Sequence, residues 1–354
     1  MDFLEELPEQ IFRDILVRVP YKSHLNIKEL LNPAKEMMEC LDFYRDRIKL
    51  GLAKKYICLL QRVGISIYDP VEQSCQLLPQ IPSGFEILGF SQIMCVNHKL
   101  VLLGLKHYDT FTTKILIFDF VSNTWKQGSD IHIARSMFAY RTSPEGSIYI
   151  AGGLEKHVPS RELREATVYN VDEDKWELLP DSHQKMGICN GVFIEGMLYV
   201  ISIMGNRIQR FDPNTREWTE MVNIRFHNSW YDDVPYAFGR LFAFGRVSAC
   251  RRNGIEQYDW EKNVFREFQP LPQHFIHVRA TVWCDRIFLC GYNDIRRRPE
   301  FYMYNPEAPL SERLIPLDES NFSTEIEMPV RLISLDEPNK SMEMRVVSIA
   351  TIEI

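Results

Sequence analysis

From residue 55 onward, the chain alternates between short runs of apolar, β-branched and aromatic residues and short polar segments. Six of the runs end on an aromatic residue that is followed at once by Asp or Asn, and a second run begins a few residues later. The six aromatic residues, which lie 42 to 51 residues apart, are Tyr68, Phe118, Tyr169, Phe211, Tyr258 and Tyr304. Each unit predicts a β-hairpin, and its recurrence at a nearly constant period predicts a repeat architecture.

A fixed offset within the hairpins supports this interpretation. Five of the six aromatic residues have an apolar or aromatic residue seven positions later, namely Cys75, Trp125, Trp176, Trp218 and Phe265. The sixth unit departs from the rule, because Ser311 occupies the corresponding position. A constant count across a turn rich in Asp, Asn and Pro is typical of hairpins with one common register.

A further pair of β-rich runs precedes most of the hairpins, as in Met137–Thr142 and Ser147–Ala151. Four strands every 45 residues or so predict a mainly β fold, a six-bladed β-propeller. The blades are expected near residues 55–79, 91–127, 137–180, 187–221, 234–270 and 277–317, with a polar insertion at 318–344. The first unit offers only three strands, so residues 345–354 are expected to supply its fourth and to close the ring.

The pattern of residues 1–50 is helical instead. Ile11, Ile15, Leu16 and Val19 share one face of a predicted helix that starts near Pro8 and ends at Pro20. Two further helical stretches follow, which gives a three-helix module. Its apolar residues are too many for its size, which indicates that the module docks on another surface.

Composition narrows the function classes. The formal net charge of -7 argues against general binding of nucleic acid. The acidic start does not resemble a signal peptide, and no run of 18 apolar residues predicts a membrane span. The eight cysteines form no CxxC pair. These features favour a reducing compartment, so a cytoplasmic or nuclear location is expected.

The third unit, Ile148-Tyr-Ile-Ala-Gly-Gly153 followed by Tyr169 and Trp176, resembles a kelch repeat. The Leu7-Pro8 opening, the Val19-Pro20-Tyr-Lys-Ser-His24 corner and the segment from Asp42 to Gly51 resemble the F-box of plant F-box/kelch-repeat proteins. The likeness covers essentially the whole chain. It is strongest to the small-kelch group, whose members direct the turnover of phenylalanine ammonia-lyase or of cytokinin-response regulators.

The resemblance implies a substrate-recognition adaptor of an SCF-type (cullin-RING) ubiquitin ligase. The helices would bind a Skp-type linker, and the propeller would bind the protein to be ubiquitinated. The linker-binding residues would be Leu7, Pro8, Ile11, Ile15, Leu16, Val19 and Pro20. The structural kelch residues would be Gly152, Gly153, Tyr169, Trp176, Trp125 and Trp218.

One segment departs from the family. A Ser-Trp-Arg-like stretch is usual in the third F-box helix, and this chain has Asn32-Pro-Ala-Lys-Glu-Met37 there. Because a tryptophan is a large buried anchor, its loss would weaken linker binding. A kelch interaction scaffold with a degenerate F-box is therefore the alternative.

No sequence motif of an enzyme is present: GxGxxG, Walker A, HExxH and GxSxG are all missing. His274, His277, Cys284 and Cys290 have spacings that match no common zinc site. We therefore expect a non-catalytic protein with neither cofactor nor metal.

The substrate-binding residues are expected on loops of the propeller. The segment from Arg225 to Asp233 is rich in aromatic and charged residues, as protein-binding hot spots are, although blade packing would explain the same composition. The candidate set is Arg135, Arg225, His227, Trp230, Tyr231 and Asp232. The basic clusters Arg251-Arg252 and Arg296-Arg-Arg298 are interpreted as solvated surface or as additional substrate contacts.

Overall fold

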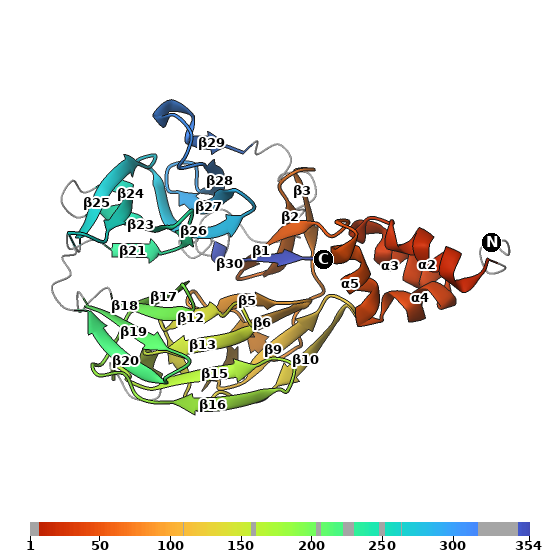
Figure 1. The fold of residues 1–354 in the computed structure, drawn as a ribbon, viewed down its shortest axis with the longest axis horizontal. Helices are drawn as coiled ribbons and strands as arrows, with labels where there is room; N and C mark the ends of the chain where they lie inside the picture. Colours follow the sequence, from red (N-terminus) through yellow and green to blue (C-terminus); the bar gives the residue numbers. More distant parts are fainter. Residues whose placement is uncertain are drawn as a thin grey trace.

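The structure is a computed structural model that describes residues 7–108, 110–156, 161–202, 207–221, 230–247, 252–262, 264–317 and 346–354. Its helices lie at one end of the molecule, and the strands form the rest of it (Figure 1). The helical elements are α2 (Glu9–Val17), η1 (Tyr21–Ser23), α3 (His24–Leu30), α4 (Asn32–Met38), α5 (Leu41–Lys49) and η2 (Leu310–Glu312).

The predicted mainly β propeller fold is confirmed. Six antiparallel sheets follow one another in the described chain, and each contains the four-strand repeat. The strands of the first three sheets are β1 (Lys55–Gln61), β2 (Gly64–Asp69), β3 (Ser74–Leu77) and β30 (Val346–Glu353); β5 (Gln92–Val96), β6 (Lys99–Leu103), β9 (Ile115–Asp119) and β10 (Thr124–Gly128); and β12 (Ala139–Thr142), β13 (Ser147–Ala151), β15 (Ala166–Asn170) and β16 (Lys175–Leu179).

The other three sheets repeat the plan. Their strands are β17 (Cys189–Ile194), β18 (Met197–Ser202), β19 (Arg207–Asp212) and β20 (Glu217–Met221); β21 (Trp230–Asp233), β22 (Tyr236–Ala237), β23 (Arg240–Val247), β24 (Arg252–Asp259) and β25 (Val264–Pro270); and β26 (Phe275–Trp283), β27 (Arg286–Asn293), β28 (Arg298–Tyr304) and β29 (Leu314–Pro316). In the fifth sheet both β21 and β22 pair with β23.

Two smaller sheets decorate the loops and were not predicted. They consist of β4 (Phe85–Glu86), β7 (Lys106–His107) and β8 (Thr110–Phe111), and of β11 (Arg135–Ser136) and β14 (Leu154–Glu155).

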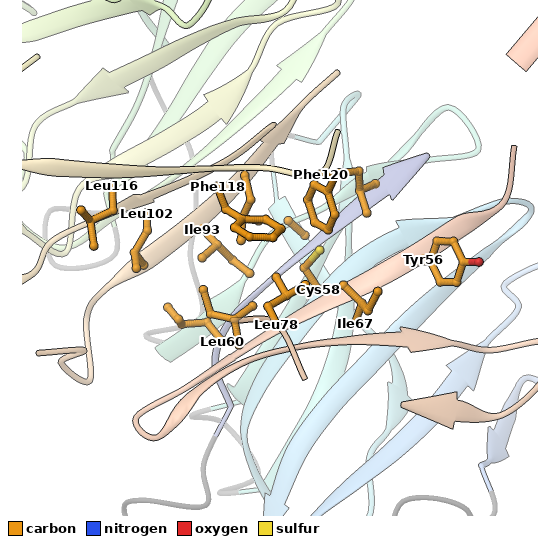
Figure 2. Packing of buried hydrophobic residues seen from close by; sticks show 14 of the residues in the cluster. Tyr56, Cys58, Leu60, Ile67, Leu78, Ile93, Leu102, Leu116, Phe118 and Phe120 are labelled. Carbon is orange, nitrogen blue, oxygen red and sulfur yellow. The ribbon is translucent and has the colours of Figure 1, made fainter. Parts of the chain in front are cut away.

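Each interface between successive sheets has its own apolar core. The cluster between the first two sheets joins Cys58 and Leu60 of β1 to Ile93 of β5 and Phe118 of β9, and Figure 2 shows these side chains converging. Four further clusters join the second sheet to the third and so on to the sixth. A sixth cluster joins Phe288 and Met303 of the last sheet to Ile57 and Tyr68 of the first. The sheets are therefore held together by side-chain packing all the way round.

The C-terminal strand closes this arrangement as predicted. β30 pairs antiparallel with β1 from Lys55↔Glu353 to Gln61↔Val346, and the first sheet has the order β3-β2-β1-β30. It is also in contact with β5 of the second sheet and β26 of the sixth. The last residues of the chain thus fill the innermost position of the first sheet.

The seven-residue offset is a cross-strand pair. Tyr68 lies opposite Cys75, Tyr169 opposite Trp176, and the same pairing recurs in the second, fourth and fifth sheets. Each turn is fixed by the Asp or Asn after the aromatic residue, whose side-chain oxygen accepts backbone N–H groups. In the sixth sheet η2 lengthens the loop, so Tyr304 pairs with Leu314 and not with Ser311.

The tryptophans of the second, third and fourth sheets also bind the sheet before them. The indole Nε1 of Trp125 donates to the carbonyl of Pro79 at 2.9 Å, that of Trp176 to Ser129 at 2.8 Å, and that of Trp218 to Pro180 at 2.7 Å. Each accepting carbonyl lies just beyond the outer strand of the preceding sheet. The repeated tryptophan therefore pairs within its own sheet and anchors the neighbouring one.

The N-terminal region contains four α-helices in the described part of the chain, not the predicted three. Leu31 is extended and Pro33 lies in the first turn of α4, so the expected middle helix is divided into α3 and α4. The predicted apolar face of α2 is also partly wrong. Phe12, Leu16 and Val17 are the buried residues of α2, whereas Ile11 and Ile15 are exposed.

The helices pack directly against the propeller. Their core, built around Phe43 and Met38, includes Val121 from the turn between β9 and β10. Tyr21 contacts the rings of Tyr56 and Phe120, and the Lys28 ammonium donates to the carbonyl of Val121. The helices and the first two sheets therefore form one packed unit.

His24 links the stability of the helices to pH. It is buried, its Nε2 donates to the carbonyl of Val19 at 3.0 Å, and its Nδ1 has no hydrogen-bond partner among the described residues. Burial is the main cause that lowers the pKa of His24 to about 4, and the nearby cations of Arg47 and Lys28 lower it further.

Because this pKa lies below the ordinary value near 6.5, the unfolded chain binds the proton first, and the helices lose about 3 kcal/mol as the pH falls from about 6.5 to 4. Residues 1–50 contain no tryptophan, so circular dichroism at 222 nm follows the helices while tryptophan fluorescence follows the propeller. We expect the helical signal to fall first on acidification. His24→Gln should remove this early loss, and the exposed control His132→Gln should keep it. An unchanged profile in His24→Gln would contradict the assignment.

Candidate functional site

An exposed apolar strip on α2 is the first candidate surface. Ile11 and Ile15 lie one turn apart and keep 49% and 44% of their surface exposed. The opposite face of the same helix is buried against α4 and α5, and the Arg13 guanidinium binds Asp46 of α5 at 2.7 Å. The strip is therefore presented by a helix that is fixed from behind. Of the predicted linker-binding residues, Pro8 and Pro20 are also exposed, and Leu7 and Val19 are half-buried.

Leu16 does not belong to that surface. It is 3% exposed and packs in the helical core, so its predicted contact with a linker is corrected to a structural role. The reason is the helical period: Leu16 lies four residues after Phe12, on the face opposite the Ile11–Ile15 strip.

The segment that replaces the usual tryptophan stretch forms α4. Ala34 and Met38 of this helix are fully buried in the same core as Phe12 and Phe43. Arg47 completes the core, since its guanidinium donates to the carbonyls of Val17 and Val19 at 2.6 Å and of Leu52 at 3.1 Å. The helices therefore keep a packed interior without a tryptophan.

A central cavity between the innermost strands is the second candidate site. It has a volume of about 320 Å³ and is lined by residues from all six sheets, such as Cys95 of β5, Phe193 of β17 and Thr351 of β30. These residues lie near the ends of their strands that lead into, or lie level with, the hairpin turn at Asn97–His98. That turn is hydrogen-bonded to Phe120, on which Tyr21 packs, so this end of the cavity is on the side of the helices.

Arg141 is the only charged residue among the described residues that line the cavity. Its side chain is 25% exposed, its Nη2 lies 3.3 Å from Oδ1 of buried Asp233, and its guanidinium lies 5.5 Å from the centre of the Tyr140 ring. Asp233 is itself held by backbone N–H groups, at 2.9 Å from Val234 and 3.1 Å from Ala280. Asp233 thus fixes Arg141 from behind the wall.

Hydroxyl groups provide the remaining polar lining. The hydroxyls of Thr281 and Thr351 are 3.0 Å apart, and Thr351 also donates to the carbonyl of Val282 at 2.8 Å. Tyr140 reaches Ser348 at 3.4 Å. Burial raises the pKa of Tyr140, Asp233 adds to the rise, and the arginines Arg141 and Arg279 oppose it. The phenol therefore stays protonated at neutral pH.

Arg135, predicted to contact substrate, is a structural residue. It is 4% exposed, and its Nη1 donates to the carbonyls of Gly152 at 3.1 Å and Glu165 at 3.0 Å. Burial is the main cause that lowers its pKa to about 10, so it remains charged. It supports the double-glycine segment of the third sheet and offers nothing to a partner.

The other predicted substrate residues are not brought together as a loop site. Trp230, Tyr231 and Asp232 lie on strand β21, which pairs with β23, so the predicted inter-blade linker is in part a strand. Arg225 and His227 lie outside the described residues, as do Arg251 and the insertion at 318–344. Arg296 to Arg298 lie at the exposed turn between β27 and β28.

The described residues hold no group of three or more His, Cys, Asp or Glu side chains that could bind a metal ion. Cys290 is buried, Cys284 is exposed, and His274 lies 3.3 Å from Asp294. No described helix is long and apolar enough to cross a bilayer.

Sequence reasoning missed Arg141 and Asp233. A signal was available, because Arg141 interrupts the β-rich run Met137–Thr142 that was predicted as an inner strand. A charged residue in such a strand either pairs or faces a cavity, and here it does both.

Comparison with known proteins gives one consistent result. No family model matches the chain. The F-box/kelch-repeat protein At1g15670 of Arabidopsis thaliana is 26% identical over 250 residues, which are 62% of this chain and 69% of that protein. The F-box/kelch-repeat protein SKIP20 of the same plant is 22% identical over 285 residues, 63% of this chain and 67% of that one. SKIP11, also an F-box/kelch-repeat protein, is 26% identical over 54% of this chain and 40% of its own length.

A solved structure titled "Structure of YjhT" covers 65% of this chain and 84% of its own with a TM-score of 0.49 and 14% identity, a likeness too low to add to the fold described above. The sequence matches agree with the kelch-like hairpins and the helices that precede them. The chain is a β-propeller protein similar in sequence to the F-box/kelch-repeat proteins of Arabidopsis.

Proposed function

We propose that this protein is a non-catalytic substrate-recognition adaptor of an SCF-type ubiquitin ligase. The helices at residues 9–49 bind a Skp-type linker, and through it a cullin-RING ligase, and the propeller binds the protein to be ubiquitinated. The observation that carries the proposal is the exposed Ile11–Ile15 strip on a helix whose other face is locked in a core continuous with the propeller. A rigid link of this kind holds a bound substrate at a fixed position relative to the linker.

The experiment is a binding measurement between the purified chain and a plant Skp-type linker by isothermal titration calorimetry. Replacing both Ile11 and Ile15 by Glu places two carboxylates in an apolar contact. Burial of an isoleucine contributes roughly 1.5–3 kcal/mol, so we expect binding at least about 100-fold weaker. Because both side chains are exposed in the free protein, the melting temperature should change little.

The matched control is Val63→Glu with Val71→Glu, which changes two exposed apolar residues on the propeller. This variant should bind the linker like the natural protein. Equal affinity of the α2 variant and the control would show that the strip is not the docking surface.

The alternative is a kelch interaction scaffold with a degenerate helical module. It is motivated by the stretch Asn32–Met37, which lacks the family's tryptophan. The packed core around Ala34 and Met38 favours the adaptor, because the helices keep their arrangement without it. Capture of a substrate without any linker in the same assay would favour the scaffold.

The substrate class is a second part of the proposal that rests on family resemblance. A phenylpropanoid-pathway enzyme such as phenylalanine ammonia-lyase is proposed, with a cytokinin-response regulator as its competitor. Affinity purification with the proteasome inhibited would distinguish the two, since only one of them should accumulate on the chain.

A further inference from the structure

We propose that the central cavity binds a carboxylate group carried by a segment of the recruited protein, and that the segment enters from the side of the helices. The inference deepens the proposed function and rests on it only in taking the ligand to be part of a protein substrate. It starts from the charge of the lining, its donors and the position of its opening.

The charge of the lining selects an anion. The guanidinium of Arg141 is the one charged group among the described lining residues, and it is partly exposed to the cavity. Asp233 does not line the cavity, and both of its oxygens already accept backbone N–H groups. Arg279, half-buried on β26, adds a second cation near Tyr140. Two arginines face one carboxylate here, so a ligand carboxylate would balance the charge.

The geometry of the donors favours a carboxylate. A guanidinium offers several N–H groups in one plane, and only part of the Arg141 fork is directed at Asp233. The threonine hydroxyls of the wall supply further hydrogen-bonding groups beside it. The volume of about 320 Å³ is at the small end of ligand sites, which suits one or two side chains of a protein segment.

The route to the cavity runs beside α5. A groove of about 410 Å³ is lined by Tyr44 and Ile48 of α5 on one side and by the end of β30 on the other. Cys95 and Thr351 line both this groove and the cavity, so the two are adjacent. A segment lying in the groove would reach Arg141 with its acidic side chain while its backbone contacts the helices.

Cys95 provides a direct readout, because its thiol lies at the junction of groove and cavity. The probe is the peptide acetyl-Gly-Glu-Gly-amide, and its isosteric control is acetyl-Gly-Gln-Gly-amide. The full chain is treated with iodoacetamide at increasing peptide concentration, and alkylation is read by mass spectrometry of the peptide that contains Cys95. The exposed thiols of Cys40 and Cys284 serve as internal standards.

We expect the glutamyl peptide to slow alkylation of Cys95 and not of Cys40 or Cys284, at concentrations about tenfold lower than the glutaminyl peptide requires. Arg141→Met should remove this preference, and Arg141→Lys should keep part of it. Arg266→Met, which breaks an exposed ion pair with Asp259, should leave it unchanged.

Equal protection by the two peptides would overturn the proposal, as would an undiminished preference in Arg141→Met. If Arg141→Met fails to fold, the comparison of the two peptides on the natural chain still decides the question. Linker binding is measured separately, so a failure here leaves the adaptor role intact, and a failure there leaves the cavity assignment intact.

Discussion

Removal of β30, by ending the chain at residue 345, is expected to unfold the propeller at ordinary temperature. The strand supplies the innermost position of the first sheet and buries Ile349, Ile352 and Ile354. Each buried isoleucine contributes roughly 1.5–3 kcal/mol, and the total stability of a domain is about 5–15 kcal/mol. The loss also exposes the edges of β1 and its neighbours, so the truncated chain should aggregate.

The effect is measured by thermal denaturation followed by tryptophan fluorescence. Ile352→Ala should lower the free energy of unfolding by about 2–5 kcal/mol, because its side chain is buried. Glu353→Ala alters the adjacent exposed residue and should change stability little. A truncated chain that melts at the temperature of the intact protein would show that β30 does not close the propeller.

Gly153→Ala is expected to be the most destabilising single substitution among the kelch glycines. Gly153 has a φ of 94°, and a Cβ there would lie 2.7 Å from the carbonyl oxygen of Ser136 and 2.8 Å from Cβ of Phe138. The first cost, left-handed backbone, is about 1–2 kcal/mol, and forced overpacking adds about 1–3 kcal/mol. We expect a total loss of about 3–5 kcal/mol.

Gly196→Ala separates these two costs. Gly196 has a φ of 78°, yet a Cβ there would meet nothing within 4 Å. Urea denaturation of both variants should therefore show a loss of only about 1–2 kcal/mol for Gly196→Ala. Equal losses in the two variants would mean that close approach at Gly153 is not what requires glycine.

The architecture was readable from the sequence because its signals are local and repeated. The Asp or Asn after each aromatic residue and the partner seven positions later fix a hairpin whatever the rest of the chain does, as Tyr169 and Trp176 show. The sixth unit fails the count because η2 changes the length of one loop. The closing strand followed from counting strands.

The site was less predictable because it depends on which way individual side chains point. Arg135 and Arg141 lie six residues apart in similar surroundings, yet one is buried against carbonyls and the other borders the cavity. In α2, the sequence pattern did not reveal that Phe12 and Leu16 face the core while Ile11 and Ile15 face outward. Such assignments depend on residues distant in the chain, such as Met38 and Val121.

Hydrogen–deuterium exchange of the full chain, with and without a purified Skp-type linker, tests the adaptor role most directly. The account predicts slower exchange confined to the helices between residues 9 and 49, strongest around Ile11 and Ile15, with the propeller unchanged. Unchanged exchange in the helices at saturating linker, or protection only on the propeller, would contradict it.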